Sequence, residues 1–313
     1  MPTLSFAPPA TRSAAVFLVA LLVTACGAAS APSPSGSPGT GGPPSSTPPS
    51  GQPGTSVGAI DHKTGATDVL LRLEEGGGFV PMEFNAAQAP GFSLYGNGVV
   101  VFQRIITTFP EADAAGIVHS TPWRTAKLDE EQIQELLDFA IVSGGLGAAR
   151  ANYVADNVAD APNSIFTVRA GGIDKTVQVN ALFEQVQPGP DSVARGAFFK
   201  LAQRLKDFDR GATIDSDIYE PERFRGVILE RDAAPELKPI AWPWPAIKPA
   251  DFKPGAGDGT GGPVFPHRVL TADEIGALMI DDVAGGLQGP VLKAPDGNLY
   301  TFILRPLLVD ESE

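Results

Sequence analysis

Residues 27–56 limit most strongly what this chain can fold into. The segment's 30 residues include eight Pro, eight Ser and seven Gly, with no charged residue and nothing larger than Gln52. Such a composition has too little apolar area to offset the entropy lost on ordering, so we expect a disordered tether. As a flexible coil it would span roughly 30 Å, and as a polyproline II helix about 90 Å. A folded body is therefore expected only from about Val57 to Glu313.

The segment before the tether carries the only cysteine of the chain, Cys26. An apolar run from Ala14 to Val23 precedes it, and Val23-Thr24-Ala25-Cys26 resembles a bacterial lipobox. The run is shorter than the roughly 20 residues that cross a bilayer, so residues 1–25 are expected to be a cleaved signal peptide. A secretory signal cleaved near Ala31, which would remove Cys26, is the alternative.

The lipobox resemblance implies that cleavage before Cys26 accompanies acylation of its sulfur. A diacylglyceryl group and an added N-acyl chain such as palmitate would anchor the protein stably in the lipid bilayer. We therefore expect a lipoprotein held at the extracytoplasmic face of the cell membrane, in the cell envelope. No thiol would remain for disulfides, for cysteine catalysis or for a Cys-based metal site.

The charge balance makes nucleic acid an improbable partner. Arg12 is the only charged residue before the tether, so the remainder holds 22 basic and 36 acidic residues, a net charge of −14. Binding to nucleic acid depends on Lys and Arg that neutralise phosphates. Anionic lipid headgroups would also repel the acidic body, so the acyl chains alone would hold it at the membrane.

Short strands and tight turns predominate in residues 57–211. A strand is predicted over residues 68–74, ending at Gly76-Gly77-Gly78, where Glu74 and Glu75 are interpreted as surface charges. A first hairpin turns at Gly96-Asn97-Gly98, because Asn-Gly supplies the positive φ angles of a tight turn. A second hairpin alternates at period two around Gly171-Gly172.

Two amphipathic helices accompany these strands. The first is predicted from Leu128 to Val142 and ends at Gly144-Gly145, and the second runs from Asp191 to Phe208. Their expected inward-facing residues are Leu128, Ile133, Leu136, Leu137 and Ala140 in the first and Val193, Phe198, Leu201, Leu205 and Phe208 in the second. The sequence therefore predicts an α+β fold, with antiparallel sheets built from β-hairpins and helices packed on one face.

The order of motifs resembles a known family. A hairpin turned at Tyr95-Gly96-Asn97-Gly98 precedes a Leu-x-x-Glu-Gln-x-x-x-Leu helix over residues 128–136. Tyr153, the strand entry Asp160-Ala161-Pro162-Asn163 and the Gly-Gly hairpin follow. Between Val69 and Phe208 the chain thus resembles an uncharacterised domain of bacterial cell-envelope lipoproteins, although it lacks the Cys-x-x-Cys pair that versions of this domain carry. The resemblance implies the fold and the location but no activity.

Residues 212–313 are expected to form a C-terminal α+β part. Leu270 to Ile275, Leu278 and Gly285-Gly286-Leu287 mirror the first helix and its Gly-Gly stop, and a hairpin turned at Pro295-Asp296-Gly297 follows. This pattern fits a degenerate repeat of the first module, but helices begin in this way often enough that chance explains it equally well.

The segment from Asp232 to Pro266 is an unusual long loop that contains Trp242-Pro243-Trp244-Pro245. Loops of this length in compact domains are usually functional or disordered. The two Trp rings could contact a sugar, a peptide or another protein. Alternatively, the segment is a strap whose rings pack on the core while its prolines protect a sheet edge.

No catalytic or metal-binding motif stands out. Gly257 to Gly262 matches G-x-G-x-x-G in letters only, because Pro-rich coil precedes it and Pro263 follows. The three histidines, His62, His119 and His267, lie far apart, which argues against zinc, and Asp209 and its neighbours are interpreted as solvated acids. We expect no cofactor and no metal.

Two hypotheses follow for the function. The preferred one is a non-catalytic binding or scaffolding module that meets a protein or glycan partner in the envelope, with Trp242 and Trp244 as candidate contacts. The alternative is a hydrolase of envelope polymers whose site is assembled from dispersed residues.

Overall fold

The computed structural model describes residues 58–106, 108–155, 158, 160–183, 188–206, 208–210, 213–234, 238–254 and 265–312. The chain divides into two compact units, Met1–Gly54 and Thr55–Glu313, and every described residue belongs to the second. Several predicted features therefore lie outside the described residues: the signal peptide, Cys26, the tether and the glycine-rich segment 257–262.

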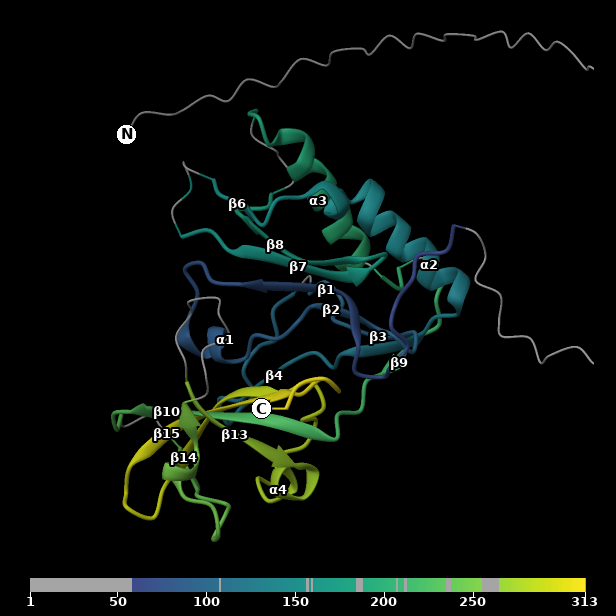
Figure 1. The fold of residues 1–313 in the computed structure, drawn as a ribbon. Helices are drawn as coiled ribbons and strands as arrows, with labels where there is room; N and C mark the ends of the chain where they lie inside the picture. The colour runs from purple at the N-terminus through teal and green to yellow at the C-terminus, as the bar shows by residue number, and fades with distance from the viewer. Residues whose placement is uncertain are drawn as a thin grey trace, which may run out of the picture. The chain divides into compact units, whose positions relative to one another are not determined.

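The second unit contains two sheets, shown in Figure 1. Sheet A has eight strands in the spatial order β6 (Asn152–Tyr153), β8 (Ile173–Asn180), β7 (Asn163–Ala170), β1 (Val69–Gly76), β2 (Phe92–Tyr95), β3 (Val99–Phe102), β5 (Arg124–Lys127) and β9 (Asp217–Ile218). All neighbouring strands are antiparallel except β6 and β8, which are parallel. The antiparallel sheets with few helices confirm the predicted α+β class.

Sheet B has the order β11 (Ile240–Ala241), β14 (Leu287–Lys293), β15 (Leu299–Pro306), β10 (Arg223–Arg231), β13 (Pro266–Thr271) and β12 (Lys253–Pro254), and β4 (Val118–His119) also pairs with β14. The sheets exchange short strands across the expected boundary at residue 211: β9 joins sheet A, and β4 joins sheet B. The two parts are thereby interlocked.

Helices cover one face of sheet A (Figure 1). These are α2 (Glu130–Asp138), its π-helical continuation η1 (Phe139–Ser143), the 3-10 turn η2 (Leu146–Ala148) and α3 (Ser192–Lys206). Asp129 caps α2 through a capping box with Gln132, which satisfies two otherwise unpaired N–H groups. Gly145, at φ 77°, begins the following turn in the left-handed region, as the predicted Gly-Gly stop requires.

The core between these helices and sheet A contains nearly all the residues predicted to face inward. Those buried are Leu128, Ile133, Leu136, Leu137, Ala140, Phe198, Leu201, Leu205 and Phe208. Val193 is the exception: it is 86% exposed, so its predicted inward position is wrong. It lies in the first turn of α3, and its neighbour Ala194 packs against the core instead.

Both predicted hairpins are confirmed. Strands β2 and β3 pair with Phe92 opposite Phe102, and only Gly98 of their turn has positive φ, 83°. The Asn97 side chain instead accepts a hydrogen bond from the Val99 N–H at 3.0 Å. Strands β7 and β8 pair along their length around Gly171 and Gly172, both at positive φ.

Sheet B has its own core on the face away from sheet A. Trp244, Phe252 and Phe302 pack there with the short helix α4 (Ala272–Gly276), and the 3-10 turn η3 (Pro249–Asp251) lies in the strap. Thr271 and Glu274 form a capping box on α4, so α2 and α4 begin alike. The remaining helix, α1 (Met82–Ala86), packs through Ala86 on Val227 and Ile303 of sheet B.

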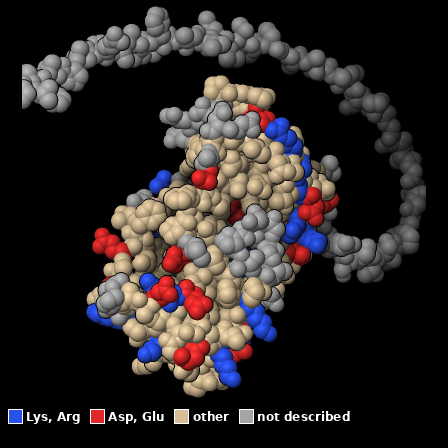
Figure 2. All heavy atoms as spheres, turned by 90° about the vertical axis from the view of Figure 1, so that its left-hand side faces the viewer, with Lys and Arg blue, Asp and Glu red and all other residues tan. Residues whose placement is uncertain are grey.

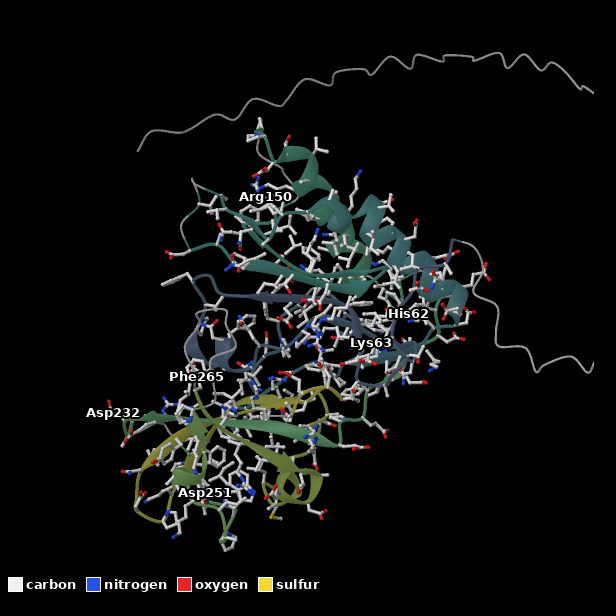
Figure 3. The ribbon with its side chains drawn as sticks, in the orientation of Figure 1. His62, Lys63, Arg150, Asp232, Asp251 and Phe265 are labelled. Carbon is white, nitrogen blue, oxygen red and sulfur yellow. The ribbon has the colours of Figure 1, made fainter. Side chains whose placement is uncertain are left out.

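The last residues of the chain contact both sheets. Leu308 packs on Val69, Tyr95 and Val101 of sheet A, whereas the Leu307 N–H donates to the Arg223 carbonyl of sheet B at 2.9 Å. Side chains from both sheets project into the space between them (Figure 3). The C-terminal segment 307–311 thus joins two sheets whose strands come from distant parts of the sequence.

Candidate functional site

A cavity of about 330 Å³ lies between sheet A, sheet B and α1. We call it the inter-sheet cavity. Its charged lining residues are Arg72, Glu74, Glu75, Arg225, Arg305 and Glu311, and its amide side chains are those of Asn85, Gln88, Asn163 and Gln178. A concave site with convergent polar groups is the usual setting of a ligand-binding site.

Strand register builds the sheet A side of the cavity. Glu74 of β1 is directly opposite Ile165 of β7, which is opposite Gln178 of β8. Residues directly opposite in antiparallel strands share a face, so these three side chains form one row across the sheet. Their chain neighbours Leu73 and Phe166 are buried in the helix-side core, because alternate strand residues point to opposite faces.

The sheet B side places two like charges opposite each other. Arg225 of β10 pairs in register with Arg305 of β15, an arrangement that is unfavourable without an anion nearby. Glu311 supplies one: its carboxylate accepts from Arg305 Nη1 at 2.9 Å and Nη2 at 2.7 Å. Although burial opposes its ionisation, the hydrogen bonds and charge of Arg305 hold the pKa of Glu311 below its ordinary value.

A second ion pair crosses from the C-terminal segment to sheet A. Arg72 Nη2 donates to Asp310 Oδ1 at 2.7 Å, and the Tyr95 hydroxyl donates to the same oxygen at 2.6 Å. Burial and the hydrogen bond to Asp310 raise the pKa of Tyr95 well above its usual value. Burial disfavours the charge of Arg72, but Asp310 outweighs it, so the pKa of Arg72 is also raised.

A glycine turn contributes to the cavity, and exposed aromatic residues are its neighbours in the chain. Gly76, Gly77 and Gly78 line the cavity, and Gly77 and Gly78 have positive φ. Phe79 follows this turn and is 93% exposed, and Phe84 of α1 is 46% exposed. Figure 2 looks onto the side of the molecule that is at the left in Figure 1, where α1 lies, and shows acidic and basic side chains in mixed clusters.

The tryptophans predicted as contacts lie together on sheet B. Their ring centroids are 5.3 Å apart in an edge-to-face arrangement. Trp244 is 4% exposed, and its Nε1 donates to the Glu274 carbonyl at 2.7 Å, so it is a core residue. Trp242 is half-buried, and its Nε1 donates to the Ile247 carbonyl at 2.6 Å.

An open groove of about 650 Å³ adjoins Trp242. Tyr300, Phe252 and four prolines (Pro245, Pro249, Pro266 and Pro295) are among its lining residues. We call it the aromatic groove. The segment therefore packs as a strap through Trp244, while Trp242 remains at a surface that a partner can reach.

The histidines do not converge on one site. His62 lies beside α2 (Figure 3), with Nε2 3.1 Å from Glu130 Oε1. His119 is 3.7 Å from Asp113, and the Nδ1 of His267 is 3.0 Å from the Phe265 carbonyl. Among the described residues, no hydrogen bond joins a histidine to a serine hydroxyl, and no group of three His, Cys, Asp or Glu side chains could hold a metal ion.

The structure adds to one interpretation of surface acids and corrects another. Glu74 and Glu75 are partly exposed, as expected of surface charges, with side chains 36% and 42% exposed, but they also line the inter-sheet cavity. The Asp209 side chain is only 7% exposed, because it pairs with Arg104 at 2.6 Å and accepts from Ser216 at 2.7 Å. A charged residue at the end of an element is solvated only when no other element covers it.

Comparison with known proteins adds no precedent for this site. The chain matches no protein-family model, no curated protein and no solved structure. Within the described ranges, the helices are all too short or too polar to cross a membrane.

Proposed function

We propose that this protein is a lipid-anchored extracytoplasmic binding module whose small polar ligand sits in the inter-sheet cavity. The observation that carries the proposal is the cavity itself: ion pairs with the C-terminal segment hold Arg72 and Arg305 in place at its surface. Groups positioned before binding cost less entropy when a ligand arrives. The expected kinship with envelope lipoprotein domains and the lipobox-like residues before Cys26 support the location.

The titration of the charged groups favours binding over acid–base catalysis. At or beside the cavity, each resolved shift moves the pKa of the group further from pH 7. The pKa values of Arg72 and Tyr95 are raised, and that of Glu311 is lowered. A general acid or base works best with a pKa near the working pH. These three groups keep one charge state at pH 7, which suits fixed recognition of a ligand.

The proposed site is tested by filling it. Ile165 lines the cavity without taking part in its ion pairs, so Ile165→Trp should block it, while Ile165→Val is the matched control. Saturation-transfer NMR on the full chain in detergent, with a mixture of amino acids, dipeptides, sugars and organic acids, should show transfer to at least one class. Transfer should vanish in Ile165→Trp and persist in Ile165→Val; no transfer to any class would contradict the proposal.

The anchor is tested separately at Cys26. Mass spectrometry of the mature protein should find an acylated N-terminal Cys26, and Cys26→Ala should release the body from the membrane fraction. An unmodified N-terminus near residue 32 would instead support the secretory alternative.

A protein or glycan partner in the envelope is a further element of the proposal, with Trp242 as the contact. The half-buried ring and the adjoining aromatic groove support it, because stacking on an aromatic face is a common mode of recognition. Nuclear magnetic resonance titration with chitotriose should shift the Trp242 indole signal, and no shift of that signal would contradict this element of the proposal.

A further inference from the structure

The lining of the inter-sheet cavity carries balanced charge. Three of its charged residues are basic (Arg72, Arg225 and Arg305) and three are acidic (Glu74, Glu75 and Glu311). A ligand with a net charge would leave that charge without compensation in a partly enclosed space, which is unfavourable. The balance therefore favours a ligand that is neutral overall.

The two signs are unevenly divided between the two sides. On the sheet A side, two acids (Glu74 and Glu75) and one base (Arg72) leave an excess of one negative charge. On the sheet B side, two bases (Arg225 and Arg305) and one acid of the C-terminal segment (Glu311) leave an excess of one positive charge. Outside the lining, Asp310 pairs with Arg72 and Lys206 pairs with Glu75, each at 2.7 Å. Asp310 neutralises the base Arg72, and Lys206 neutralises the acid Glu75, both on the sheet A side. The excess of one negative charge on that side is therefore unchanged. The cavity is dipolar, with its negative side on sheet A.

An independent observation points to an acceptor on the sheet B side. Arg305 is 4% exposed, and its Nη1 and Nη2 are bound to the Glu311 carboxylate and the Pro306 carbonyl. Its buried Nε has no hydrogen-bond partner among the described residues. Buried donors are nearly always satisfied in native proteins, and a ligand carboxylate would provide the acceptor.

Resting on the proposed function, we infer that the inter-sheet cavity binds short zwitterionic peptides. The ligand ammonium lies toward Glu74 on sheet A, and its carboxylate lies toward Arg305 on sheet B. A zwitterion is neutral overall and matches the dipole of the cavity.

Isothermal titration calorimetry on the full chain in detergent tests this inference, with glycyl-phenylalanine as the probe. Its N-acetyl derivative lacks the ammonium, and its C-terminal amide lacks the carboxylate. Because each modification removes a charge-assisted hydrogen bond, each should weaken binding about tenfold or more. N-acetylglucosamine and succinate serve as the neutral and dianionic comparisons.

A substitution on the protein assigns the ammonium contact. Glu74→Gln should weaken binding of the free dipeptide about tenfold and leave binding of a C-terminally free but N-acetylated dipeptide unchanged. The matched control is Glu131→Gln, an exposed acid of α2 on the far face of sheet A, which should change neither. Thermal melting of both variants verifies that they fold.

The outcomes separate this inference from the proposed function. Equal affinity for free and blocked dipeptides, binding of only N-acetylglucosamine or succinate, or binding of no probe would each overturn the zwitterion inference. If only N-acetylglucosamine or succinate binds, the proposed function stands, provided that Ile165→Trp abolishes that binding. Dipeptide binding that persists in Ile165→Trp would place the site elsewhere and contradict both.

Discussion

Arg305 and Glu311 form a bidentate ion pair, with their nitrogen–oxygen distances at 2.9 and 2.7 Å. The pair connects β15 of sheet B to the C-terminal segment, and the Leu308 N–H donates to the same carboxylate at 2.8 Å. Glu311 thereby compensates an arginine that is almost wholly buried. The neighbouring Asp310 holds Arg72 of sheet A, so two successive acids connect both sheets.

Removing Glu311 should destabilise the body. Glu311→Ala leaves the buried Arg305 guanidinium without its anion, and breaking a buried pair in this way typically costs about 3 kcal/mol or more. Urea denaturation measures the free energy of unfolding. The control Glu131→Ala removes an exposed acid and should change stability by less than about 0.5 kcal/mol; equal effects of the two variants would contradict the structural role of the pair.

Stability should fall at acidic pH because of Glu311. The pKa of this carboxyl in the folded state lies below its ordinary value of 4.5, so the unfolded chain binds a proton more readily. Its contribution is fully present above pH 4.5 and is lost as the pH falls through the folded pKa. The difference in unfolding free energy between the wild type and Glu311→Gln, followed by urea titration at several pH values, should shrink below pH 4.5; a constant difference would contradict this assignment.

The two strap tryptophans should differ in their effect on stability. Trp244→Ala removes a fully packed ring, and such core truncations cost about 3–5 kcal/mol. Trp242→Ala removes a half-buried ring and should cost about 2 kcal/mol, because less apolar area returns to water. Thermal unfolding followed by circular dichroism compares them, and a larger loss from Trp242→Ala would mean that the strap is packed differently.

Substitution of two hairpin glycines distinguishes the cost of backbone strain from the cost of a steric clash. Gly98 and Gly172 both have positive φ, at 83° and 74°. A Cβ at Gly98 would lie 2.5 Å from the Leu128 carbonyl oxygen, whereas one at Gly172 would meet nothing within 4 Å. Gly172→Ala should therefore cost about 1–2 kcal/mol for the left-handed conformation alone. Gly98→Ala should cost measurably more in the same urea assay, and equal costs would mean that the α2 entry moves freely.

Much of sheet A and its helices could be predicted because their signals are local. Ile133, Leu136 and Leu137 recur at helical spacing, and Gly98 supplies the turn conformation where the chain reverses. Such patterns depend only on neighbours within a few residues. The strap was predicted with two alternatives, and the structure gives each tryptophan a different role because Trp244, not Trp242, lies over Phe302.

The inter-sheet cavity could not be predicted, although one signal pointed toward it. Arg305 interrupts the apolar run of residues 302–308, and a charge inside a buried strand needs a partner. The sequence does not show that the partner is Glu311, nor that Arg225 lies directly opposite. Strand order and register set those relationships, and they depend on contacts between residues far apart in the chain.

By itself, the sequence determined the α+β class, the two hairpins and the two long helices. Tertiary structure alone decided that Glu74 and Glu75 line a cavity, that Asp310 and Glu311 join two sheets, and that Val193 is exposed. The physical reason is that periodicity specifies which face of an element is apolar, whereas the burial of a charge depends on which faces meet. Around the inter-sheet cavity the lining is largely polar, and hydrophobic pattern carries no information about which polar residues meet there.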